Sequence, residues 1–273
     1  MKITCDLCLH HCTLEEGQTG FCLGRANHNG KVVSLAYGKL TSLALDPIEK
    51  KPFARYLPGH MILSAGSFGC NMKCPFCQNY EISCADSCAN REISPEELVD
   101  IAVQEKMHDN IGIAFTYNEP FINYEYVRDC FALAKQKDLK CVLVTNGMVS
   151  SNYLKELLPY VDAMNIDLKG FRPEIYQKLQ GDLECVKTNI ALANPLCHVE
   201  VTSLIVPGLN DDPKDMEAEA KWLASIDPEM PLHITRFFPR YHMQDSEPTD
   251  IQLLDSLITI ASKYLMHVYR GNC

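Results

Sequence analysis

Three cysteines fall within eight residues in the stretch CNMKCPFCQN, at Cys70, Cys74 and Cys77. Thiolates at this CxxxCxxC spacing can converge on one [4Fe–4S] cluster from a tight loop. Three thiolates on four irons leave one iron without a protein ligand, much as catalytic zinc keeps an open position. The spacing therefore favours a catalytic iron–sulfur site. A structural zinc site completed by Cys84 or Cys88 is the alternative.

Four more cysteines lie near the start of the chain, at Cys5, Cys8, Cys12 and Cys22. Four thiolates suit a tetrahedral zinc ion or a second iron–sulfur cluster, and the spacing does not separate the two. We favour structural zinc here. A second cluster and unligated thiols are the alternatives.

The chain has 14 cysteines in 273 residues, and most of them are grouped. The N-terminal stretch MKITCDLCLHHC lacks the apolar run of a signal peptide, which predicts a cytoplasmic protein. Grouped thiols in a reducing compartment indicate metal binding rather than disulfide bonds.

Charge and hydropathy narrow the range of partners. A net charge of −10 and a pI near 5.4 argue against a nucleic-acid partner, because neutralising phosphates requires clustered Lys and Arg. The apolar runs are much shorter than the roughly 20 residues that a membrane span requires. We therefore expect neither nucleic acid nor a membrane as a partner.

The elements that must position these thiols follow from the hydrophobic pattern. From about residue 60 onward, apolar runs alternate with amphipathic helical segments, which is typical of βα units around a parallel sheet. The pattern predicts an α/β fold, a partial, TIM-like (β/α)6 barrel over residues 59–273. Residues 1–58 are Gly-rich, with strand-like runs at 32–37 and 41–45, and are predicted to form a small cysteine-rich appendage that binds metal. The apolar runs of the barrel cover residues 61–66, 111–116, 140–145, 163–168, 198–206 and 232–237, with 266–271 as a further candidate.

Helix start signals separate these runs. Ser94 is followed by Pro95 and then by Glu97, which combines an N-cap serine, a proline at the first helical position and a capping-box glutamate. Further helices are expected to begin near the residues Ser151, Asp212 and Thr249.

Polar side chains follow the later strands of the predicted barrel. Chemistry in parallel barrels collects at the carboxyl ends of the strands, so these side chains are candidates for the same site as the three cysteines. Each segment also reads as an ordinary turn or a solvated strand end. The candidates are Asn118 and Glu119 in TYNEP, Asn146 in TNG, Asp167 and Lys169 in DLK, and His242 in FPRYHM.

The CxxxCxxC motif, with Phe76 directly before its last cysteine, resembles the cluster motif of the radical SAM superfamily. This resemblance extends over the predicted barrel. It implies that S-adenosylmethionine (SAM) chelates the open iron and that the reduced cluster cleaves it to methionine and a 5′-deoxyadenosyl radical. Glu119 lies where the superfamily has a GGE-type motif that binds the methionine amino group. Tyr117 and Asn118 replace the two glycines, so the backbone contacts of that motif are not carried over.

Other segments resemble the glycyl-radical activating enzymes of this superfamily. The resemblance implies that Asp167 and Lys169 border the ribose and carboxylate of SAM, that Asn146 lines the adenosine site and that His242 lies near SAM. It also implies a low-potential electron donor of the flavodoxin or ferredoxin type.

The whole pattern of motifs is similar to the AmmeMemoRadiSam-system radical SAM proteins, which are related to pyruvate formate-lyase activating enzyme. This similarity implies a glycyl radical enzyme, or AMMECR-type and Memo-type proteins, as partners. Three interpretations remain: glycyl-radical activation, radical modification of another molecule, and a non-catalytic zinc or iron–sulfur electron-transfer protein. The motifs that carry the similarity are CDLCLHHCTLEEGQTGFCLGR, LDPIEKKPFARYLPG, CPFCQNYEIS, TYNEP and RFFPRY.

Overall fold

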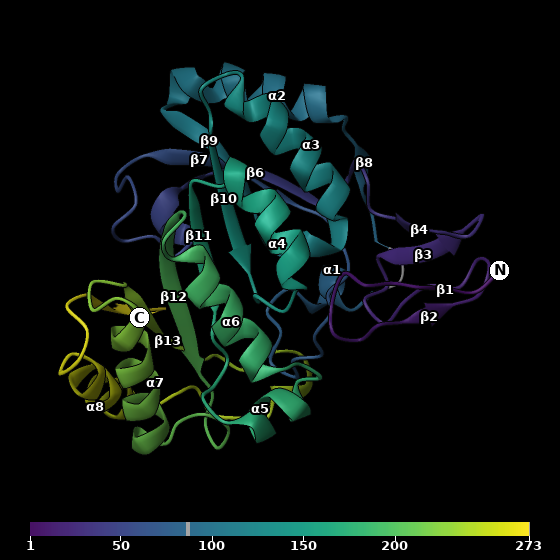
Figure 1. The fold of residues 1–273 in the computed structure, drawn as a ribbon. Helices are drawn as coiled ribbons and strands as arrows, with labels where there is room; N and C mark the ends of the chain where they lie inside the picture. Colours follow the sequence, from purple (N-terminus) through teal and green to yellow (C-terminus); the bar gives the residue numbers. More distant parts are fainter. Residues whose placement is uncertain (86–87, 273) are drawn as a thin grey trace.

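The computed structural model describes residues 1–85 and 88–272. Within these residues, an eight-stranded sheet forms the centre of the molecule (Figure 1). Its strands run parallel from β7 to β14, and β6 pairs antiparallel with β7 at one edge. In spatial order the strands are β14 (Val268–Gly271), β13 (Leu232–Arg236), β12 (His198–Ile205), β11 (Ala163–Asp167), β10 (Lys140–Thr145), β9 (Asn110–Phe115), β7 (Met61–Gly66) and β6 (Ser42–Pro47). The predicted α/β fold and its parallel sheet are confirmed.

Helices connect the parallel strands and cover the outer face of the sheet (Figure 1). The helix start predicted at Ser94 is confirmed, because its side chain accepts from the Glu97 amide and Glu97 closes the capping box. Asp212 and Asp250 cap α7 and α8 in the same way as side-chain acceptors. The helices are α1 (Tyr80–Ser83), α2 (Pro95–Gln104), α3 (Tyr124–Lys135), α4 (Ser151–Leu157), α5 (Pro173–Lys178), α6 (Leu183–Ala193), α7 (Pro213–Ile226) and α8 (Ile251–Ala261).

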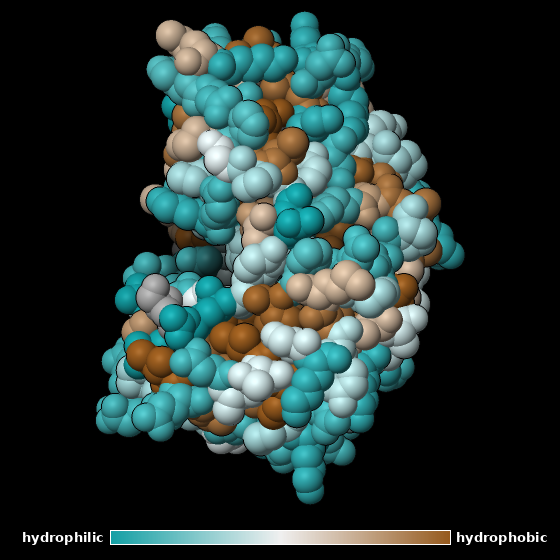
Figure 2. All heavy atoms as spheres, turned by 90° about the vertical axis from the view of Figure 1, so that its left-hand side faces the viewer, coloured by the Kyte–Doolittle hydropathy of each residue, from teal (hydrophilic) through white to brown (hydrophobic). Residues whose placement is uncertain are grey.

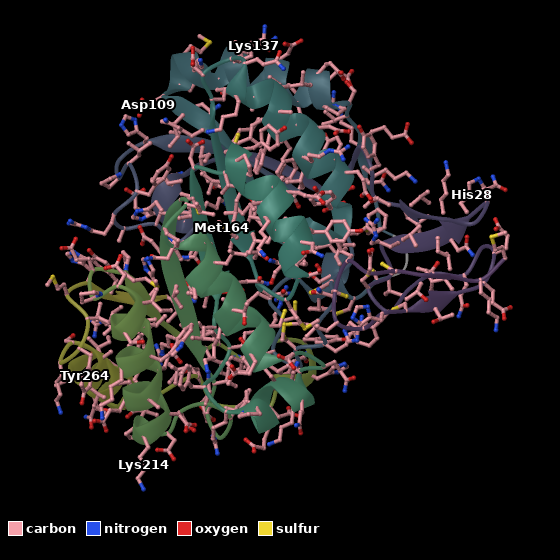
Figure 3. The ribbon with its side chains drawn as sticks, viewed as in Figure 1. His28, Asp109, Lys137, Met164, Lys214 and Tyr264 are labelled. Atoms are coloured by element: carbon pink, nitrogen blue, oxygen red, sulfur yellow. The ribbon has the colours of Figure 1, made fainter. Side chains whose placement is uncertain are left out.

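The N-terminal segment forms short hairpins beside the sheet (Figure 1). Figure 3 labels His28 at the far tip of the β3–β4 hairpin. Part of the predicted appendage belongs to the barrel, however, because β6 pairs with the whole length of β7, from Ser42 opposite Gly66 to Pro47 opposite Met61. The small pairs are β1 (Ile3–Thr4) with β2 (Thr13–Leu14), β3 (Arg25–His28) with β4 (Lys31–Ser34), and β5 (Lys39–Leu40) with β8 (Arg91–Glu92).

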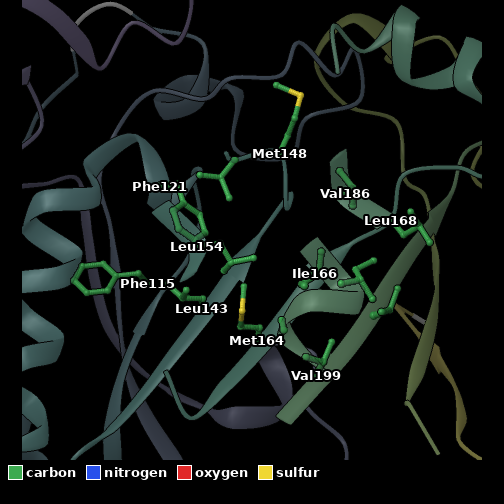
Figure 4. Packing of buried hydrophobic residues seen from close by; sticks show 14 of the residues in the cluster. Phe115, Phe121, Leu143, Met148, Leu154, Met164, Ile166, Leu168, Val186 and Val199 are labelled. Carbon is green, nitrogen blue, oxygen red and sulfur yellow. The ribbon is translucent and has the colours of Figure 1, made fainter. Parts of the chain in front are cut away.

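The main core lies between the sheet and its helices (Figure 4). Side chains alternate between the two faces of each strand, so Leu143 of β10 packs toward the helices while Val142 faces the barrel interior. Figure 4 shows Leu143, Met164 and Ile166 of neighbouring strands beside Leu154 of α4. This packing fixes the positions of the strand ends, where the site loops begin.

The segment that follows β6, residues 48–55, packs against the inner face of the barrel and is called the plug. Ile48 and Phe53 are fully buried there and pack against residues of three parallel strands, namely Ala114, Val142 and Ala163. This plug closes the barrel below the site loops.

Buried Glu200 of β12 anchors the plug. Its two carboxylate oxygens accept hydrogen bonds from the backbone amides of Ala54 and Arg55, at 2.9 and 2.8 Å. His198 and His233 lie at 2.9 and 2.6 Å from the same carboxylate. Glu200 thus holds the plug together with Asn165 of β11, whose Nδ2 donates to the Pro52 carbonyl oxygen at 2.7 Å.

Figure 2 shows the side of the molecule that lies at the left of Figure 1. Hydrophilic side chains cover most of this face, and apolar ones gather near its middle. No helix in the described part of the chain combines the length and apolar character needed to cross a bilayer.

Candidate functional site

A cavity of about 370 Å³ opens at the carboxyl ends of the parallel strands. This volume falls in the range of small-molecule sites, which is typically about 300–1,000 Å³. The cavity brings together the loop that carries the three cysteines and the loops that follow β9, β10 and β11. Nine of the residues predicted for the site line it: Cys70, Cys74, Phe76, Cys77, Asn118, Glu119, Asn146, Asp167 and Lys169.

The cysteine loop is held by backbone hydrogen bonds from both directions. The Cys70 amide donates to the carbonyl oxygen of Cys22 at 3.1 Å, and the Lys73 amide donates to Leu179 at 2.9 Å. Gly69 has a φ of +86°, and a Cβ there would lie 2.6 Å from the Cys22 carbonyl oxygen. Glycine is therefore required where this loop touches the N-terminal segment.

Burial dominates the chemistry of the three thiols. It raises the pKa of Cys74 to about 12 and raises the pKa values of Cys70 and Cys77. Lys169 acts in the opposite direction on Cys74, as the second-largest influence on that thiol. Metal ligation requires thiolates. A cation bound at this cavity would stabilise the thiolate form, which burial disfavours.

Glu119 lies at the floor of the cavity as a buried carboxylate, with only 3% of its surface exposed. Its Oε1 accepts from Thr145 Oγ1 at 2.8 Å and from the Phe121 amide at 3.1 Å, while Oε2 accepts from the Asn146 amide at 2.8 Å. Burial raises the pKa of Glu119 to about 7 despite these hydrogen bonds. The arrangement fixes a carboxylate that a cationic ligand would stabilise in its charged form.

Asn118 fastens the TYNEP segment to the cysteine loop, and Tyr117 fastens it to β6. Asn118 Oδ1 accepts from the Ser67 amide at 3.0 Å, and its Nδ2 donates to the Gly69 carbonyl oxygen at 3.0 Å. Tyr117 has a φ of +73°, and its hydroxyl donates a hydrogen bond to Asp46 Oδ2 at 2.9 Å. Tyr117 and Asn118, which stand where the GGE-type motif would have two glycines, thus form hydrogen bonds with other segments of the chain.

Asn146 links the cysteine loop to the end of β10. Its Nδ2 lies 2.9 Å from Asn71 Oδ1 and 3.6 Å from Cys70 Sγ, while its Oδ1 accepts from the Met148 amide at 2.8 Å. An amide donor beside a thiolate ligand stabilises the charged sulfur. The structure therefore places Asn146 next to the Cys70 thiol and the cysteine loop.

Asp167 and Lys169 form an ion pair on the cavity wall, with Oδ2 and Nζ 2.9 Å apart. Although burial opposes its charge, Asp167 and then Cys74 hold the pKa of Lys169 above its ordinary value. The Lys169 amide also donates to the Tyr176 hydroxyl at 3.1 Å. This wall carries both signs of charge.

His242 is not among the described residues that line the cavity. Its side chain is exposed and its ring is tilted against that of Tyr241, with centroids 3.7 Å apart, while its backbone amide donates to the Pro75 carbonyl oxygen at 2.9 Å. His242 therefore supports the cysteine loop through its backbone. Cys84 and Cys88 are also absent from the described lining of the cavity.

Several cavity residues were not predicted from the sequence. Lys50 and Pro52 belong to the plug and reach the site from below, and Asn272 follows the last strand. The charged stretch LDPIEKKP before the first parallel strand is the one signal that points to the first two. Its place inside the barrel depends on the long-range contact with Glu200.

The four N-terminal cysteines also share one cavity, together with Arg25 and apolar side chains. Burial raises the pKa of Cys8 to about 12 and raises that of Cys22. Among the described residues, no three His, Cys, Asp or Glu side chains form a group that could hold a single metal ion. Zinc, which the sequence analysis favours at these cysteines, therefore has no support.

Comparison with known proteins identifies the family. Residues 66–223, which contain the cysteine loop and the segments after β9, β10 and β11, match the radical SAM superfamily. The chain belongs to this superfamily. Membership implies a [4Fe–4S] cluster and SAM as cofactors. The thiols and polar groups of the cavity fit that requirement.

Relatives by sequence include proteins of two kinds. The chain is 40% identical over 277 residues to an uncharacterised protein of Methanocaldococcus jannaschii, which covers 99% of this chain and 81% of that protein. It is 32% identical over 154 residues to pyruvate formate-lyase 1-activating enzyme of Escherichia coli, covering 53% of this chain and 61% of that enzyme. The chain thus spans 61% of that activating enzyme's length, which is less than two thirds.

Solved structures share the fold. A domain of pyruvate-formate lyase-activating enzyme from Bacteroides vulgatus superposes with a TM-score of 0.51 at 21% identity, covering 59% of this chain and 99% of that domain. A radical SAM methyltransferase from Sphaerobacter thermophilus gives a TM-score of 0.59 at 13% identity, covering 79% and 67%. At these identities the likeness extends to the radical SAM fold alone.

Proposed function

We propose that this protein cleaves SAM reductively and directs the resulting 5′-deoxyadenosyl radical to hydrogen abstraction from a substrate. The observation that carries the proposal is the shared cavity. Three thiols, a buried carboxylate, an amide and an ion pair come from separate loops after four parallel strands and face the same space: Cys70, Cys74, Cys77, Glu119, Asn146, Asp167 and Lys169.

Cys70, Cys74 and Cys77 would hold the [4Fe–4S] cluster, and no fourth cysteine lines the described part of their cavity. When bound, the cluster supplies the electron that breaks a carbon–sulfur bond of SAM. Asn146 stabilises the Cys70 sulfur through its amide. Lys169 favours the thiolate form of Cys74.

The remaining residues of the cavity bind and orient the cosubstrate. Glu119 would accept the methionine ammonium, because its position is fixed by three donors and a carboxylate oxygen can accept a further hydrogen bond. Asp167 and Lys169 would border the ribose and the carboxylate. The plug below and the cysteine loop above limit the access of water to the reacting centre.

A non-catalytic electron-transfer protein is the second candidate from the sequence. The cavity argues against it, because an iron–sulfur protein that only carries electrons has no need for a space of about 370 Å³ lined by charged side chains beside its cysteines. Burial of the Glu119 carboxylate without a cationic partner is likewise unfavourable, unless a ligand supplies the positive charge.

The proposed substrate class is a backbone glycine of a partner protein. Its support is the similarity to pyruvate formate-lyase 1-activating enzyme over 154 residues. AMMECR-type and Memo-type proteins are the further partners that the motif pattern implies, and a flavodoxin- or ferredoxin-type protein is the proposed electron donor. Radical modification of another molecule is the competing substrate class.

The test of the proposal is formation of 5′-deoxyadenosine. The protein would be reconstituted anaerobically with iron and sulfide, then given SAM and dithionite, with products followed by mass spectrometry. We expect 5′-deoxyadenosine from the native chain and from a Cys185→Ser control, and none from Cys74→Ser. No 5′-deoxyadenosine from native protein that holds its iron would refute the function.

Labelled glycine separates the substrate classes. A candidate glycyl radical enzyme would be prepared with deuterated glycine and incubated with the reconstituted protein and SAM. Transfer of deuterium into 5′-deoxyadenosine is the expected result. Absence of transfer from every candidate partner, with 5′-deoxyadenosine still formed, would contradict glycyl-radical activation.

A further inference from the structure

The four N-terminal cysteines enclose a second cavity that the radical SAM site does not use. Its walls combine thiols with apolar side chains and one buried cation. The lining residues include Cys5, Cys8, Cys12, Cys22, Leu7, Leu14, Ile122 and Arg25. A closed pocket of four thiols in an apolar wall is the donor set of an iron–sulfur cluster.

We propose that these four cysteines bind a second iron–sulfur cluster, of the [4Fe–4S] type, which supplies electrons to the radical SAM site. The site itself is argued from the N-terminal residues and their contacts. Only the electron acceptor rests on the proposed function.

Arg25 supplies the first independent observation. Its side chain is 4% exposed, and the guanidinium binds Glu125 through both terminal nitrogens, at 2.8 and 2.6 Å. Its Nε is buried and finds no hydrogen-bond partner among the described residues. Burial of an unpartnered donor is unfavourable, so an unplaced acceptor is expected at this cavity.

A cluster provides that acceptor. Inorganic sulfide and cysteine thiolates accept hydrogen bonds, and a cluster with four thiolates is anionic, so an adjacent guanidinium compensates its charge. Arg25 lines the same cavity as Cys5 and Cys22. The same nitrogen would help to set the reduction potential of the cluster.

Direct contacts with the radical SAM loop supply the second observation. The Cys22 carbonyl oxygen accepts from the Cys70 amide at 3.1 Å, and His10 Nε2 lies 2.8 Å from the Asn71 carbonyl oxygen. Asn71 is in turn bonded to Asn146, which contacts Cys70 Sγ. A ligand of one site is thus one hydrogen bond from a ligand of the other.

These contacts favour a redox-active group over zinc, which cannot change its oxidation state. One electron would enter the N-terminal site from a reduced flavodoxin- or ferredoxin-type protein, and one electron would leave it for the Cys70 site. No bond forms or breaks at the N-terminal cysteines. A cluster held there would return to its oxidised state after each transfer.

The decisive variant removes the radical SAM ligands and keeps the N-terminal segment intact. A Cys70→Ser, Cys74→Ser, Cys77→Ser protein would be reconstituted anaerobically and analysed for metal, sulfide and electron paramagnetic resonance. We expect about four irons and four sulfides per chain and a signal after reduction. One zinc per chain, or no bound iron, would overturn the proposal.

The complementary variant is Cys8→Ser, Cys22→Ser. Its iron content should fall from about eight to about four per chain, with 5′-deoxyadenosine formation retained on dithionite and reduced at least tenfold when reduced flavodoxin is the donor. Unchanged iron would contradict the site, and an unchanged flavodoxin-dependent rate would contradict the relay. If this variant does not fold, the triple variant still decides the site.

The two proposals fail in different ways. If the triple variant retains its iron while the native chain makes no 5′-deoxyadenosine, the N-terminal cluster stands and the proposed function falls. If the triple variant holds no iron while the native chain makes 5′-deoxyadenosine, the reverse is true.

Discussion

The backbone amide of Cys70 donates a hydrogen bond to the carbonyl oxygen of Cys22 at 3.1 Å. Cys70 is the first cysteine of the radical SAM motif, and Cys22 is the last of the N-terminal group. Two segments that lie 48 positions apart in the chain therefore meet at their metal-ligand candidates. The geometry of either group of thiols depends on the other.

Gly69→Ala tests this contact. An added Cβ would lie 2.6 Å from the Cys22 carbonyl oxygen, at a φ of +86°. We expect a loss of roughly 3 kcal/mol in the free energy of unfolding and a lower iron content after reconstitution. Chemical denaturation and iron analysis would measure both.

Gly59→Ala is the matched control, because its φ is +89° and nothing lies within 4 Å of an added Cβ. This variant should lose only about 1–2 kcal/mol in the free energy of unfolding, from backbone strain, and should keep its iron. Equal effects of the two substitutions would show that the contact with Cys22 is unimportant.

Glu119→Gln should weaken SAM binding by about 10- to 100-fold, because a charge-assisted hydrogen bond to the ammonium is lost. Iron content should not change, since Glu119 is not a ligand of the cluster. Glu219→Gln is the matched control: Glu219 is equally buried, on α7, and accepts from Ser203 away from the cavity. Isothermal titration with SAM would measure both affinities. Similar losses in the two variants would argue against the role of Glu119.

Arg25 should raise the reduction potential of the proposed N-terminal cluster. Because removing Arg25 alone leaves Glu125 unpaired, the informative comparison is Arg25→Gln, Glu125→Gln against Glu125→Gln. Loss of the Nε hydrogen bond, worth about 1.4 kcal/mol, should lower the potential by roughly 60 mV. Redox titration followed by electron paramagnetic resonance would measure the shift. Identical potentials in the two variants would contradict a hydrogen bond from Arg25.

Glu200 should make the fold sensitive to acid. Burial raises its pKa, but the hydrogen bonds of His198 and His233 and two backbone amides outweigh burial and lower the pKa from 4.5 to about 2. Because the folded-state pKa is the lower one, the carboxylate stabilises the fold above pH 4.5. That contribution, about 3 kcal/mol, is lost as the pH falls toward 2.

Unfolding of Glu200→Gln at two pH values would check this. Its deficit relative to the native chain should be about 3 kcal/mol at pH 7 and clearly smaller at pH 3. Glu174→Gln, on the exposed surface of α5, should show no deficit at either pH. A deficit that does not change with pH would contradict the ionic role of Glu200.

Much of the fold could be predicted because apolar runs and helix caps are local signals. The run at 140–145 coincides with β10, and Ser94 begins α2 as expected. The site could be predicted for a related reason: parallel strands place their following loops at one edge, so Glu119 and Asp167 meet although 48 positions separate them.

The features that the sequence did not reveal depend on long-range contacts. Strand β6 joins the sheet by pairing with β7, and the plug enters the barrel because Glu200 binds its backbone. Neither the pairing of β6 nor the position of the plug can be recognised from a local stretch of sequence. His242 is outside the cavity because its short helical turn directs only its backbone toward Pro75.

The central claim is that Cys70, Cys74 and Cys77 hold a cluster whose open iron binds SAM. Electron paramagnetic resonance of the reduced Cys8→Ser, Cys22→Ser variant, with and without SAM labelled with ¹⁷O or ¹⁵N in its methionine part, tests it most directly. The account predicts a [4Fe–4S]⁺ signal that changes on addition of SAM and shows hyperfine coupling to the label. A signal that SAM leaves unchanged, with no coupling, would contradict it.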